Sequence, residues 1–388
     1  MSRLEELIQQ YCPDGVEFVQ IGQISQVGTG SSNGNEADED GIFPFFVRSQ
    51  TVKRKNDYEY DEEAIIIPGE GGIGDIFHYI NGKYALHQRV YRIHFTTPSI
   101  NTKFAFYYLK SAFKQFILMK AVSATVVSIR KPMIEGFPIP VPPLPVQEEI
   151  VRILDTFTEL QAELQAELQK RLQQYNYYRD NLLSFEGRTD VEWKKLGEIA
   201  SIKTGRRFVR TDIRESGVPC FHYGDLYTYY GLTATQTKGY LDAELASKLR
   251  FAQPNDVVVV CAGENDMDIG VGVAWLGNEP AVVHDACCIV HHNQNPRYIS
   301  HFLRTHNYHL QMRRYVKKGK ISSLPASGLA EAIIPIPSLE EQEKIASILD
   351  RFDALTNDIT AGLPAEIEAR RKQYEYYRDQ LLTFKQKA

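Results

Sequence analysis

The chain has 388 residues, of which 43% are hydrophobic and 24% are charged, an ordinary composition for a protein of two or three domains. The apolar runs stay below the roughly 18 residues that cross a bilayer, and the N-terminus lacks a signal-peptide core, so we expect no membrane segment and a cytoplasmic location. The five cysteines form no CxxC pair, which argues against a disulfide framework and a zinc site, and the net charge of −5 alone disfavours a nucleic-acid partner.

Two segments with the same pattern open two domains. Residues 15–30, GVEFVQIGQISQVGTG, and residues 190–205, DVEWKKLGEIASIKTG, lie 175 residues apart, alternate like strands and end at Thr-Gly. A short stub, residues 1–14, precedes the first opening. Each domain continues into a β-branched run, residues 64–67 or 257–260, that predicts a strand in each.

A helix and a proline-rich exit follow in each domain. Thr97-Pro98 and Asn295-Pro296 precede the helical segments, and we expect the proline at the first helical position with the Thr or Asn capping the free amides. The exits, residues 137–145 and 333–338, resemble stiff spacers that would hold each domain at a fixed angle to the next segment.

Residues 144–185 carry a single apolar seam at spacings of four and three, which predicts a long amphipathic helix with a coiled-coil seam. The seam positions are Ile150, Leu154, Phe157, Leu164, Leu168, Tyr175, Tyr178, Leu182 and Phe185. Residues 339–384 repeat the segment, first at an offset of 195 residues and then at an offset of 199. The four extra residues fall around residues 361–364, Ala-Gly-Leu-Pro, where proline predicts a kink or break.

These elements predict an α+β fold of two similar mixed α/β domains, residues 1–143 and 188–337, and two long helices, residues 144–187 and 338–388. Two such units related by a pseudo-twofold axis would place the helices antiparallel. The first domain has no full helix before it, so the end of the last helix near Phe384 should approach Gly15 in space.

Basic residues concentrate in two stretches that contain no Asp or Glu. Residues 76–134 hold nine basic residues, and residues 286–330 hold seven. Because the two stretches occupy equivalent places in the two repeats, they suggest two faces held against phosphate.

Residues Gly69–Gly74 fit GxGxxG, so a dinucleotide site must be weighed against a glycine-rich turn between strands. The turn is favoured because Glu70 would sit beside the pyrophosphate, the following residues read as a strand, and after Asp75 no acid follows until Glu135 to bind a ribose. His87 and His284 sit at matching places after strand-like runs, where each either reaches bases or closes a turn.

Basic and amide side chains near these places are the candidates for DNA contact. Arg and Gln can make bidentate contacts to guanine and adenine, which favours Gln88 and Arg89 for base reading, while flexible lysines usually contact phosphate. The predicted DNA-binding set is Lys53, Arg54, Lys83, Gln88, Arg89, Arg130, Lys131, Lys203, Arg206, Arg207, Arg210, Arg314, Lys317, Lys318 and Lys320. The histidines lack ligand neighbours at metal spacing, no catalytic signature stands out, and we predict neither a metal site nor a catalytic residue.

The two helices end in the same aromatic doublets, which carry more aromatic surface than one seam can use. We predict that part of it binds a partner protein, because Tyr and Arg are favoured interface anchors, with intramolecular packing as the alternative. The predicted partner-binding residues are Tyr177, Tyr178, Arg179, Tyr376, Tyr377 and Arg378.

The VEF and VEW openings, the Pro-Ile-Pro exits and both YYRD strings together resemble the specificity subunit of a type I restriction-modification system, in particular the type IC branch, over nearly the whole chain. The resemblance implies two target-recognition domains that each read one half of a split double-stranded DNA target, and no catalysis or cofactor in the chain itself. It also implies two docked methyltransferase subunits that bring S-adenosylmethionine and methylate adenine, and restriction/translocase subunits that join for cleavage. Since the two domains differ between their openings and exits, the target should be asymmetric.

Two hypotheses from other classes remain. A nucleotide-dependent enzyme built on Gly69–Gly74 predicts tight nucleotide binding, and a coiled-coil scaffold with two adhesive domains predicts no DNA affinity even at low salt. Within the leading hypothesis, the tandem Gln-Ala-Glu-Leu units at residues 161–164 and 165–168 predict a ruler, because one unit lengthens a helix by about 6 Å.

Overall fold

The computed structural model describes residues 3–120, 128–264, 268–358 and 361–387. These residues form two compact units, residues 1–162 with 369–388 and residues 163–368. The division differs from the four predicted segments because each unit combines one of the two domains with parts of both helical segments. Within the described ranges, no helix joins the length and the apolarity that crossing a membrane requires.

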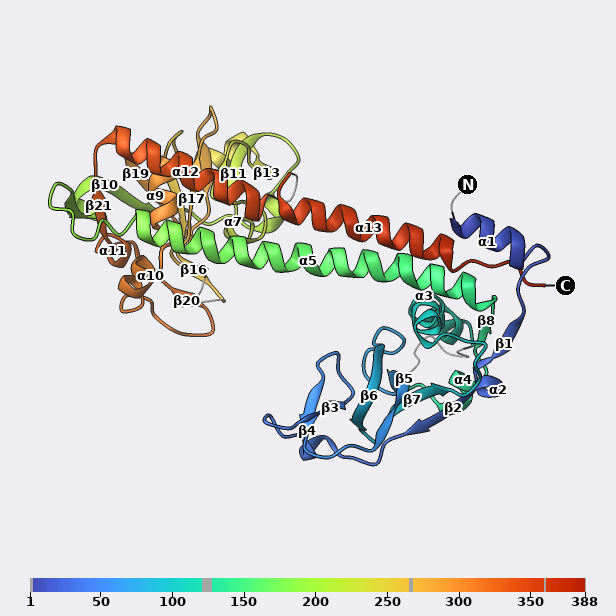
Figure 1. The fold of residues 1–388 in the computed structure, drawn as a ribbon. Helices are drawn as coiled ribbons and strands as arrows, with labels where there is room; N and C mark the ends of the chain where they lie inside the picture. The colour runs from blue at the N-terminus through green and yellow to red at the C-terminus, as the bar shows by residue number, and fades with distance from the viewer. Residues whose placement is uncertain (1–2, 121–127, 265–267, 359–360, 388) are drawn as a thin grey trace. The chain divides into compact units, whose positions relative to one another are not determined.

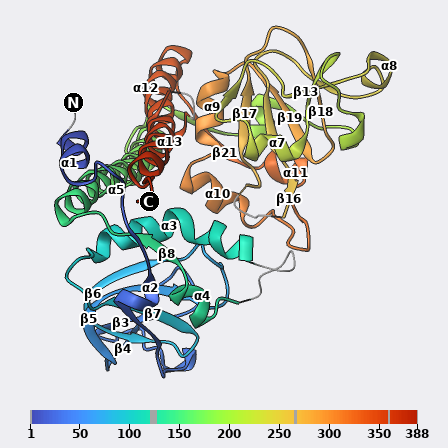
Figure 2. The ribbon, with the colours of Figure 1, turned by 90° about the vertical axis from the view of Figure 1, so that its right-hand side faces the viewer.

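The first unit contains a six-stranded mixed sheet with one helix across a face (Figures 1 and 2). Its strands in spatial order are β2 (Ser25–Thr29), β7 (Val90–Phe95), β5 (Tyr60–Pro68), β6 (His78–Leu86), β3 (Phe43–Phe46) and β4 (Lys53–Lys55). The predicted strand at residues 64–67 is confirmed as the buried centre of β5. Ile65 and Ile67 pack in the same cluster as helix α3 (Thr102–Lys120), and Ala64 and Ile66 pack on the opposite face, so β5 is apolar on both sides.

The second unit repeats the central strands and then departs from the first. Its five-stranded sheet has the order β10 (Ala200–Thr204), β19 (Cys287–His292), β15 (Val257–Val260), β17 (Gly272–Trp275) and β12 (Thr233–Ala234). A second sheet has the order β13 (Gly239–Leu241), β11 (Val218–Phe221), β18 (Ala281–Val283) and β14 (Phe251–Ala252). The nine-residue β6 thus corresponds to two short strands, β17 and β18, that belong to different sheets.

Short elements complete both units. In the first unit they are α1 (Arg3–Tyr11), α2 (Ile21–Ile24), the 3-10 turn η1 (Gly34–Glu36) and α4 (Lys131–Glu135). In the second unit they are α6 (Leu196–Ile199), η2 (Arg210–Asp212), α7 (Tyr223–Thr228), α8 (Ala243–Ala246), α11 (Ala326–Leu329) and the paired strands β16 (Ala262–Gly263) and β20 (Ser322–Ser323).

The proline-rich exits, predicted as stiff spacers, each contain a strand that pairs within its own domain. In the first unit β1 (Phe18–Gln20) pairs with β8 (Pro138–Pro140), and in the second β9 (Glu192–Lys195) pairs with β21 (Ile333–Ile336). Proline has no amide to donate, but a two-stranded ribbon has open outer edges where the missing donor is tolerated. The strand that begins each domain therefore pairs with the strand that ends it.

The predicted cap of the first domain helix was also wrong. Helix α3 begins at Thr102, and the Asn101 side chain accepts a hydrogen bond from the Phe104 amide at 3.1 Å. In the second domain the prediction is confirmed, because Asn295 caps α9 (Pro296–Phe302) with Pro296 in its first turn. The expected single helix there is divided, since a second helix, α10 (His306–Met312), starts after a new cap at Thr305.

The long helical segments match their prediction. Helix α5 runs without a break from Leu144 to Leu182, about 58 Å for its 39 residues. The second segment divides into α12 (Leu339–Asn357) and α13 (Leu363–Leu381), so the predicted break before Pro364 is confirmed.

Inside each unit, the beginning of one repeat helix packs against the end of the other, as in an antiparallel pair. In the first unit the Phe157 ring stacks on Tyr377 at 5.7 Å and meets Tyr374 at 6.3 Å. In the second unit Phe352 makes the equivalent contacts, to Tyr178 at 5.4 Å and to Tyr175 at 6.5 Å.

The chain ends close the first unit as predicted. The Val16 amide donates to the Lys385 carbonyl at 2.8 Å, and the Lys387 amide donates to the Val16 carbonyl at 2.9 Å. The approach of the C-terminal segment to Gly15 is therefore confirmed, and a Cβ added at that glycine would lie 2.6 Å from the Lys385 carbonyl oxygen.

Candidate nucleic-acid interface

The two domains carry an equivalent turn where β6 and β18 end. The His87 amide donates to the Phe46 carbonyl at 3.0 Å, and the His284 amide donates to the Phe221 carbonyl at 3.1 Å. Each imidazole then accepts through Nδ1 from the amide two residues later, Arg89 at 3.0 Å and Ala286 at 3.1 Å. The structure thus shows both histidines closing a turn.

Both turn histidines are held neutral. Burial lowers the pKa of His87, with smaller contributions from two neighbouring arginines, and burial also lowers the pKa of His284. A neutral ring that accepts at Nδ1 carries its proton on Nε2. Each histidine therefore adds no charge to the pocket beside it.

The glycine that ends each opening segment is required by its close contact with this turn. A Cβ on Gly30 would lie 1.7 Å from the Leu86 carbonyl oxygen, and one on Gly205 would lie 2.2 Å from the His284 carbonyl oxygen. Because no side chain fits at either place, glycine lets the opening strand pass against the turn in both domains.

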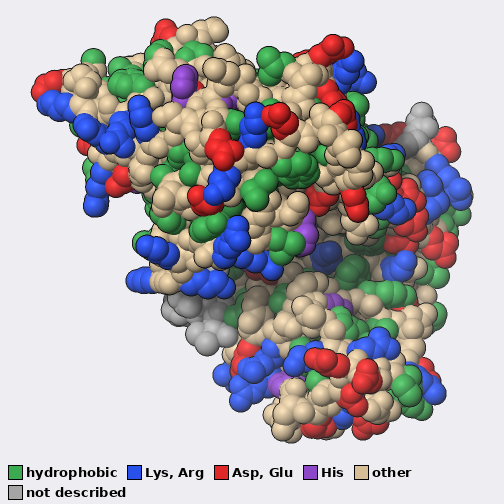
Figure 3. Space-filling model, turned by 90° about the vertical axis from the view of Figure 1, so that its left-hand side faces the viewer, with side chains coloured by type: hydrophobic (Ala, Val, Ile, Leu, Met, Phe, Trp, Pro, Cys, Tyr) green, Lys and Arg blue, Asp and Glu red, His purple; other side chains and the backbone are tan. Residues whose placement is uncertain are grey.

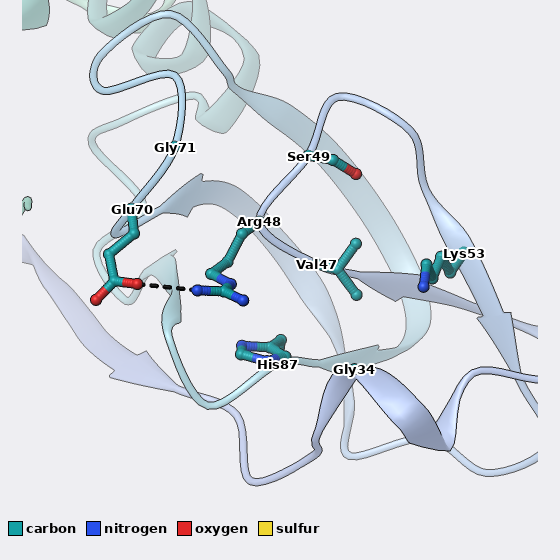
Figure 4. Close-up of a pocket in the computed structure, with 8 residues that line it drawn as sticks. All are labelled: Gly34, Val47, Arg48, Ser49, Lys53, Glu70, Gly71 and His87. Carbon is teal, nitrogen blue, oxygen red and sulfur yellow. Dashed lines mark hydrogen bonds and ion pairs between the residues drawn. The ribbon is translucent and has the colours of Figure 1, made fainter.

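A polar pocket of about 470 Å³, here called the first pocket, lies beside the His87 turn. Its lining residues are Gly34, Val47, Arg48, Ser49, Lys53, Glu70, Gly71 and His87 (Figure 4). The Glu70 carboxylate accepts from Arg48 at 3.0 Å and from Arg89 at 3.0 and 3.1 Å. The hydrogen bonds from Arg89 and then from Arg48 hold the pKa of Glu70 below its ordinary value, so this carboxylate stays ionised.

The glycine-rich segment that carries Glu70 is a turn between strands. It joins β5 to β6, which pair antiparallel, and no helix follows it. Gly71, Gly72 and Gly74 have φ of 73°, 60° and 70°, which L side chains rarely adopt. The strand–turn–helix context of a dinucleotide site is missing, so the nucleotide alternative is contradicted.

An aromatic pocket of about 750 Å³, here called the second pocket, lies beside the His284 turn. The His284 ring lies 4.9 Å from His222 and 5.2 Å from Tyr223, and Phe208 meets it edge-on at 5.1 Å. Other lining residues are Arg207, Val209, Arg210, Tyr227, Ala262, Gly263, Glu264, Asp268, Asp285, Ala286 and Ile321. The two pockets share a position but not a lining.

Matching hydrogen bonds align the two pockets residue by residue. The Gly69 amide donates to the Arg89 carbonyl at 2.9 Å, and the Cys261 amide donates to the Ala286 carbonyl at 2.8 Å. Ala286 therefore takes the place of Arg89, and Ala262, the residue after Cys261, takes that of Glu70. Counting two residues on from Phe46 and from Phe221 places Tyr223 where the first domain has Arg48.

The structure brings part of the predicted DNA-binding set to these pockets. Lys53 lines the first pocket, Arg89 joins it through Glu70, and Arg207 and Arg210 line the second. Sequence reasoning missed Arg48, which lies outside both acid-free stretches, and treated Glu70 only as an objection to a nucleotide.

The remaining predicted residues of the first domain lie elsewhere. Arg54 donates to the carbonyls of residues 41 and 42, and Gln88 donates to Asn33 at 2.7 Å. Lys83 lies 4.5 Å from the centre of a tyrosine ring, Arg130 precedes α4, and Lys131 pairs with a glutamate one turn later. Most of these side chains therefore make contacts within their own domain.

The second domain also distributes its predicted residues. Arg206 donates to the Lys248 carbonyl at 2.7 Å, and Lys203 lines a separate pocket. Arg314 lies over the Tyr315 ring, Lys317 pairs with residue 323, Lys318 lines a third pocket and Lys320 is exposed. On the face in Figure 3, Lys and Arg side chains likewise occur in several separate groups.

The predicted partner-binding tyrosines divide into two kinds. Tyr177 and Tyr376 are 66% and 60% exposed, whereas Tyr178 and Tyr377 stack on seam phenylalanines. Arg179 and Arg378 lie over neighbouring tyrosine rings and pair with the following aspartates. The outer tyrosine of each doublet therefore offers most of the available aromatic surface.

Comparison with known proteins gives consistent matches. A family model described as "Type I restriction modification DNA specificity domain" matches residues 13–174 and 189–369. The chain is 36% identical over 259 residues to the EcoR124I/EcoR124II specificity subunit of Escherichia coli, covering 64% of this chain and 63% of that one. It is 30% identical over 367 residues to a Haemophilus influenzae chain named as a type I restriction enzyme specificity subunit, covering 89% of each.

Solved structures share the fold. An S subunit of a type I restriction-modification system from M. genitalium matches with a TM-score of 0.58 at 15% identity, covering 95% of this chain and 96% of that one. A chain from a study of complex assembly and conformational transition of the type I R-M system matches with the same TM-score at 14% identity. The prediction of an α+β fold with two similar domains is confirmed.

Proposed function

The chain belongs to the family of type I restriction-modification DNA specificity proteins, and we infer that it acts as the non-catalytic subunit that selects the DNA target of such a complex. It reads a bipartite target with one recognition domain for each half-site. The family membership confirms the resemblance seen in the sequence.

One observation carries the proposal: the same turn, in the same frame, supports two differently lined pockets. The first pocket is ionic, with Arg48, Glu70 and Arg89, while five aromatic or imidazole rings line the second, together with two arginines and three carboxylates. Unlike side chains contact unlike base edges. The two half-sites should therefore differ, and the target should be asymmetric.

The duplicated helix ends support docking of two methyltransferase subunits, one on each. Tyr177 and Tyr376 occupy equivalent exposed places, and a groove of about 630 Å³ beside Tyr177 is lined by residues 167–178 of α5. The methyltransferase subunits would bring S-adenosylmethionine and methylate adenine, and restriction/translocase subunits would join for cleavage. Such a complex works in the cytoplasm.

The proposal is tested by mapping methylated adenines in DNA from cells that carry the complete system with and without this chain. We expect one split, asymmetric motif that disappears without the chain. Methylation that persists unchanged in its absence would overturn the proposal. Binding of the complex to a motif-bearing duplex should weaken steeply as salt rises, because Lys and Arg contacts release counterions, whereas a coiled-coil scaffold predicts no DNA affinity at any salt concentration.

A further inference from the structure

At the first pocket two arginines share one carboxylate, and a purely structural role does not explain this arrangement. The side chains of Arg89, Arg48 and Glu70 are 57%, 49% and 35% exposed. Ion pairs at such exposure contribute little to stability, because water screens the charges and ordering long side chains costs entropy. The arrangement therefore points to a ligand that these arginines contact.

The geometry leaves a recognition edge open on each arginine. Both arginines bond Glu70 through one terminal nitrogen, Nη1. Among the residues that the structure describes, no side chain or carbonyl accepts from Nε or Nη2 of Arg89. A guanidinium can donate two parallel hydrogen bonds, and the commonest base partner for such a pair is guanine, through O6 and N7.

Arg89 is also held in place before any ligand arrives. Its amide donates to His87 Nδ1 at 3.0 Å, and its carbonyl accepts from the Gly69 amide at 2.9 Å. The carboxylate fixes the far end of the side chain, and the neutral His87 adds no competing charge. A donor pair whose backbone and tip are both fixed loses less entropy on binding.

The second domain carries different residues at the three places that make up this arrangement. Ala262, Ala286 and Tyr223 occupy the places of Glu70, Arg89 and Arg48, so the shared carboxylate is not repeated at its place. The carboxylates that line the second pocket, Glu264, Asp268 and Asp285, lie at other positions. The difference confines the requirement to one half-site and supplies an internal control.

We propose that Arg89 is the specificity-determining residue for a guanine in the half-site read by the first domain, and that Glu70 is the positioning residue that holds its guanidinium. This inference rests on the proposed function. Arg48 shares the carboxylate and keeps the Glu70 side chain turned toward the pocket (Figure 4).

The test uses the complete complex in cells, with methylated adenines mapped across the genome for the wild type and for Arg89→Ala, Arg89→Lys and Glu70→Gln. A bidentate contact discriminates its base by about 10- to 100-fold, so Arg89→Ala should erase that preference at one position of one half-site. Arg89→Lys keeps the charge but not the paired donors, so it should retain methylation and still lose the guanine. Glu70→Gln keeps the shape and should weaken the preference by a smaller factor.

The matched control is Arg207→Ala, which removes an arginine from the wall of the second pocket. It should leave the guanine preference intact and alter only the other half-site or the overall extent of methylation. A loss of guanine preference with Arg207→Ala would show that the readout is not local to the first pocket.

Failure of this inference and failure of the proposed function give different results. If Arg89→Lys retains the full motif, or if the wild-type motif has no guanine in either half-site, the guanine reading is overturned while the chain still selects DNA. If Arg89→Ala abolishes methylation altogether, the motif of Arg89→Lys decides. If methylation does not depend on the chain at all, the proposed function itself fails.

Discussion

The side-chain contacts that join each domain to its helix, here called the joints, lie at equivalent positions in the two repeats, whereas the pockets differ. In the first unit Asp155 of α5 accepts from Lys103 and from the Tyr107 hydroxyl, both at 2.7 Å. In the second unit Asp350 of α12 takes the place of Asp155, with Arg297 as its ion-pair partner and His301 as its donor at 2.8 Å. The partners change type but keep their place.

A buried glutamine makes the second half of each joint. Gln147 accepts from the Asn101 amide at 2.8 Å and donates to two carbonyls, and Gln342 accepts from the Asn295 amide at 2.9 Å and donates to Gln294 and to a carbonyl. Both glutamines are fully buried. The contacts that hold each domain on its helix are therefore separate from the pocket. A change in the pocket can alter what is contacted without weakening those contacts.

The largest expected effect comes from breaking a joint. Gln342→Ala leaves a buried amide and two acceptors without their partner, and buried groups without hydrogen bonds each cost about 1–3 kcal/mol. We expect the second unit to lose roughly 2–4 kcal/mol of unfolding free energy, measured by denaturant titration and by hydrogen exchange of β15 and α9.

Gln147→Ala is the matched change and should destabilise the first unit by a similar amount, with exchange increasing in β5 and α3. The comparison would break if one variant were as stable as the wild type. It would also break if either variant loosened only the opposite unit.

The second prediction concerns pH at the Asp350 joint. Burial raises the pKa of Asp350, but the interactions with His301 and Arg297 lower it by a larger amount. The net pKa therefore lies below the ordinary 3.8. A depressed carboxyl pKa stabilises the fold above about pH 3.8, and the contribution is lost as the pH falls through the folded-state value. Asp350→Asn should therefore cost about 1–3 kcal/mol at pH 7.

Unfolding curves between pH 7 and pH 3 would measure this contribution. The difference between Asp350→Asn and the wild type should shrink as the acid limit is approached. A constant difference across that range would contradict the charge-based account of the joint.

The joints also show how far the sequence alone leads. The repeat offsets single out Gln147 with Gln342 and Asp155 with Asp350, because each pair keeps both residue type and place. Their partners are not visible in this way, since Tyr107 and His301 differ in type and become equivalent only when each is seen on its aspartate. The cap at Asn101 was missed for the same reason, as its amide is fixed by a residue 46 positions away.

The pockets were harder to predict than the joints. Acid-free stretches mark charge but not contact, so they included Lys131, which pairs with its own helix, and omitted Arg48. Glu70 looked unsuitable for an anion site until the structure placed two arginines on its carboxylate. A useful signal would have been the turn itself, where residues 87 and 284 allow the loops of the two domains to be aligned.

A third prediction separates outer from inner tyrosines on the helix ends. Tyr177→Ala combined with Tyr376→Ala removes two largely exposed rings, so stability should change by less than about 0.5 kcal/mol. Affinity for the methyltransferase subunit should fall by about 10-fold or more, since exposed tyrosines of this kind are common interface anchors. Quantitative co-purification with the methyltransferase measures the effect.

Tyr178→Phe is the matched control, because it keeps the ring that stacks on Phe352 at 5.4 Å. It should leave both stability and co-purification unchanged. If the double variant assembles as tightly as the wild type, the outer rings serve only their neighbours on the helix.

The smallest expected effect tests whether the two reading domains can be re-spaced without touching joints or pockets. Inserting one more Gln-Ala-Glu-Leu unit after Leu168 adds four residues, about 6 Å of helix and a rotation of about 40°, so the seam stays close to its original face. We expect both half-sites to be retained and the spacer between them to grow by one or two base pairs of about 3.4 Å each. Inserting two residues instead turns the helix by about 200°, which moves the seam away from its partner and should abolish methylation. An unchanged spacer in the methylation map of the four-residue variant would show that α5 does not set the distance, because every other determinant of the target would have been left in place.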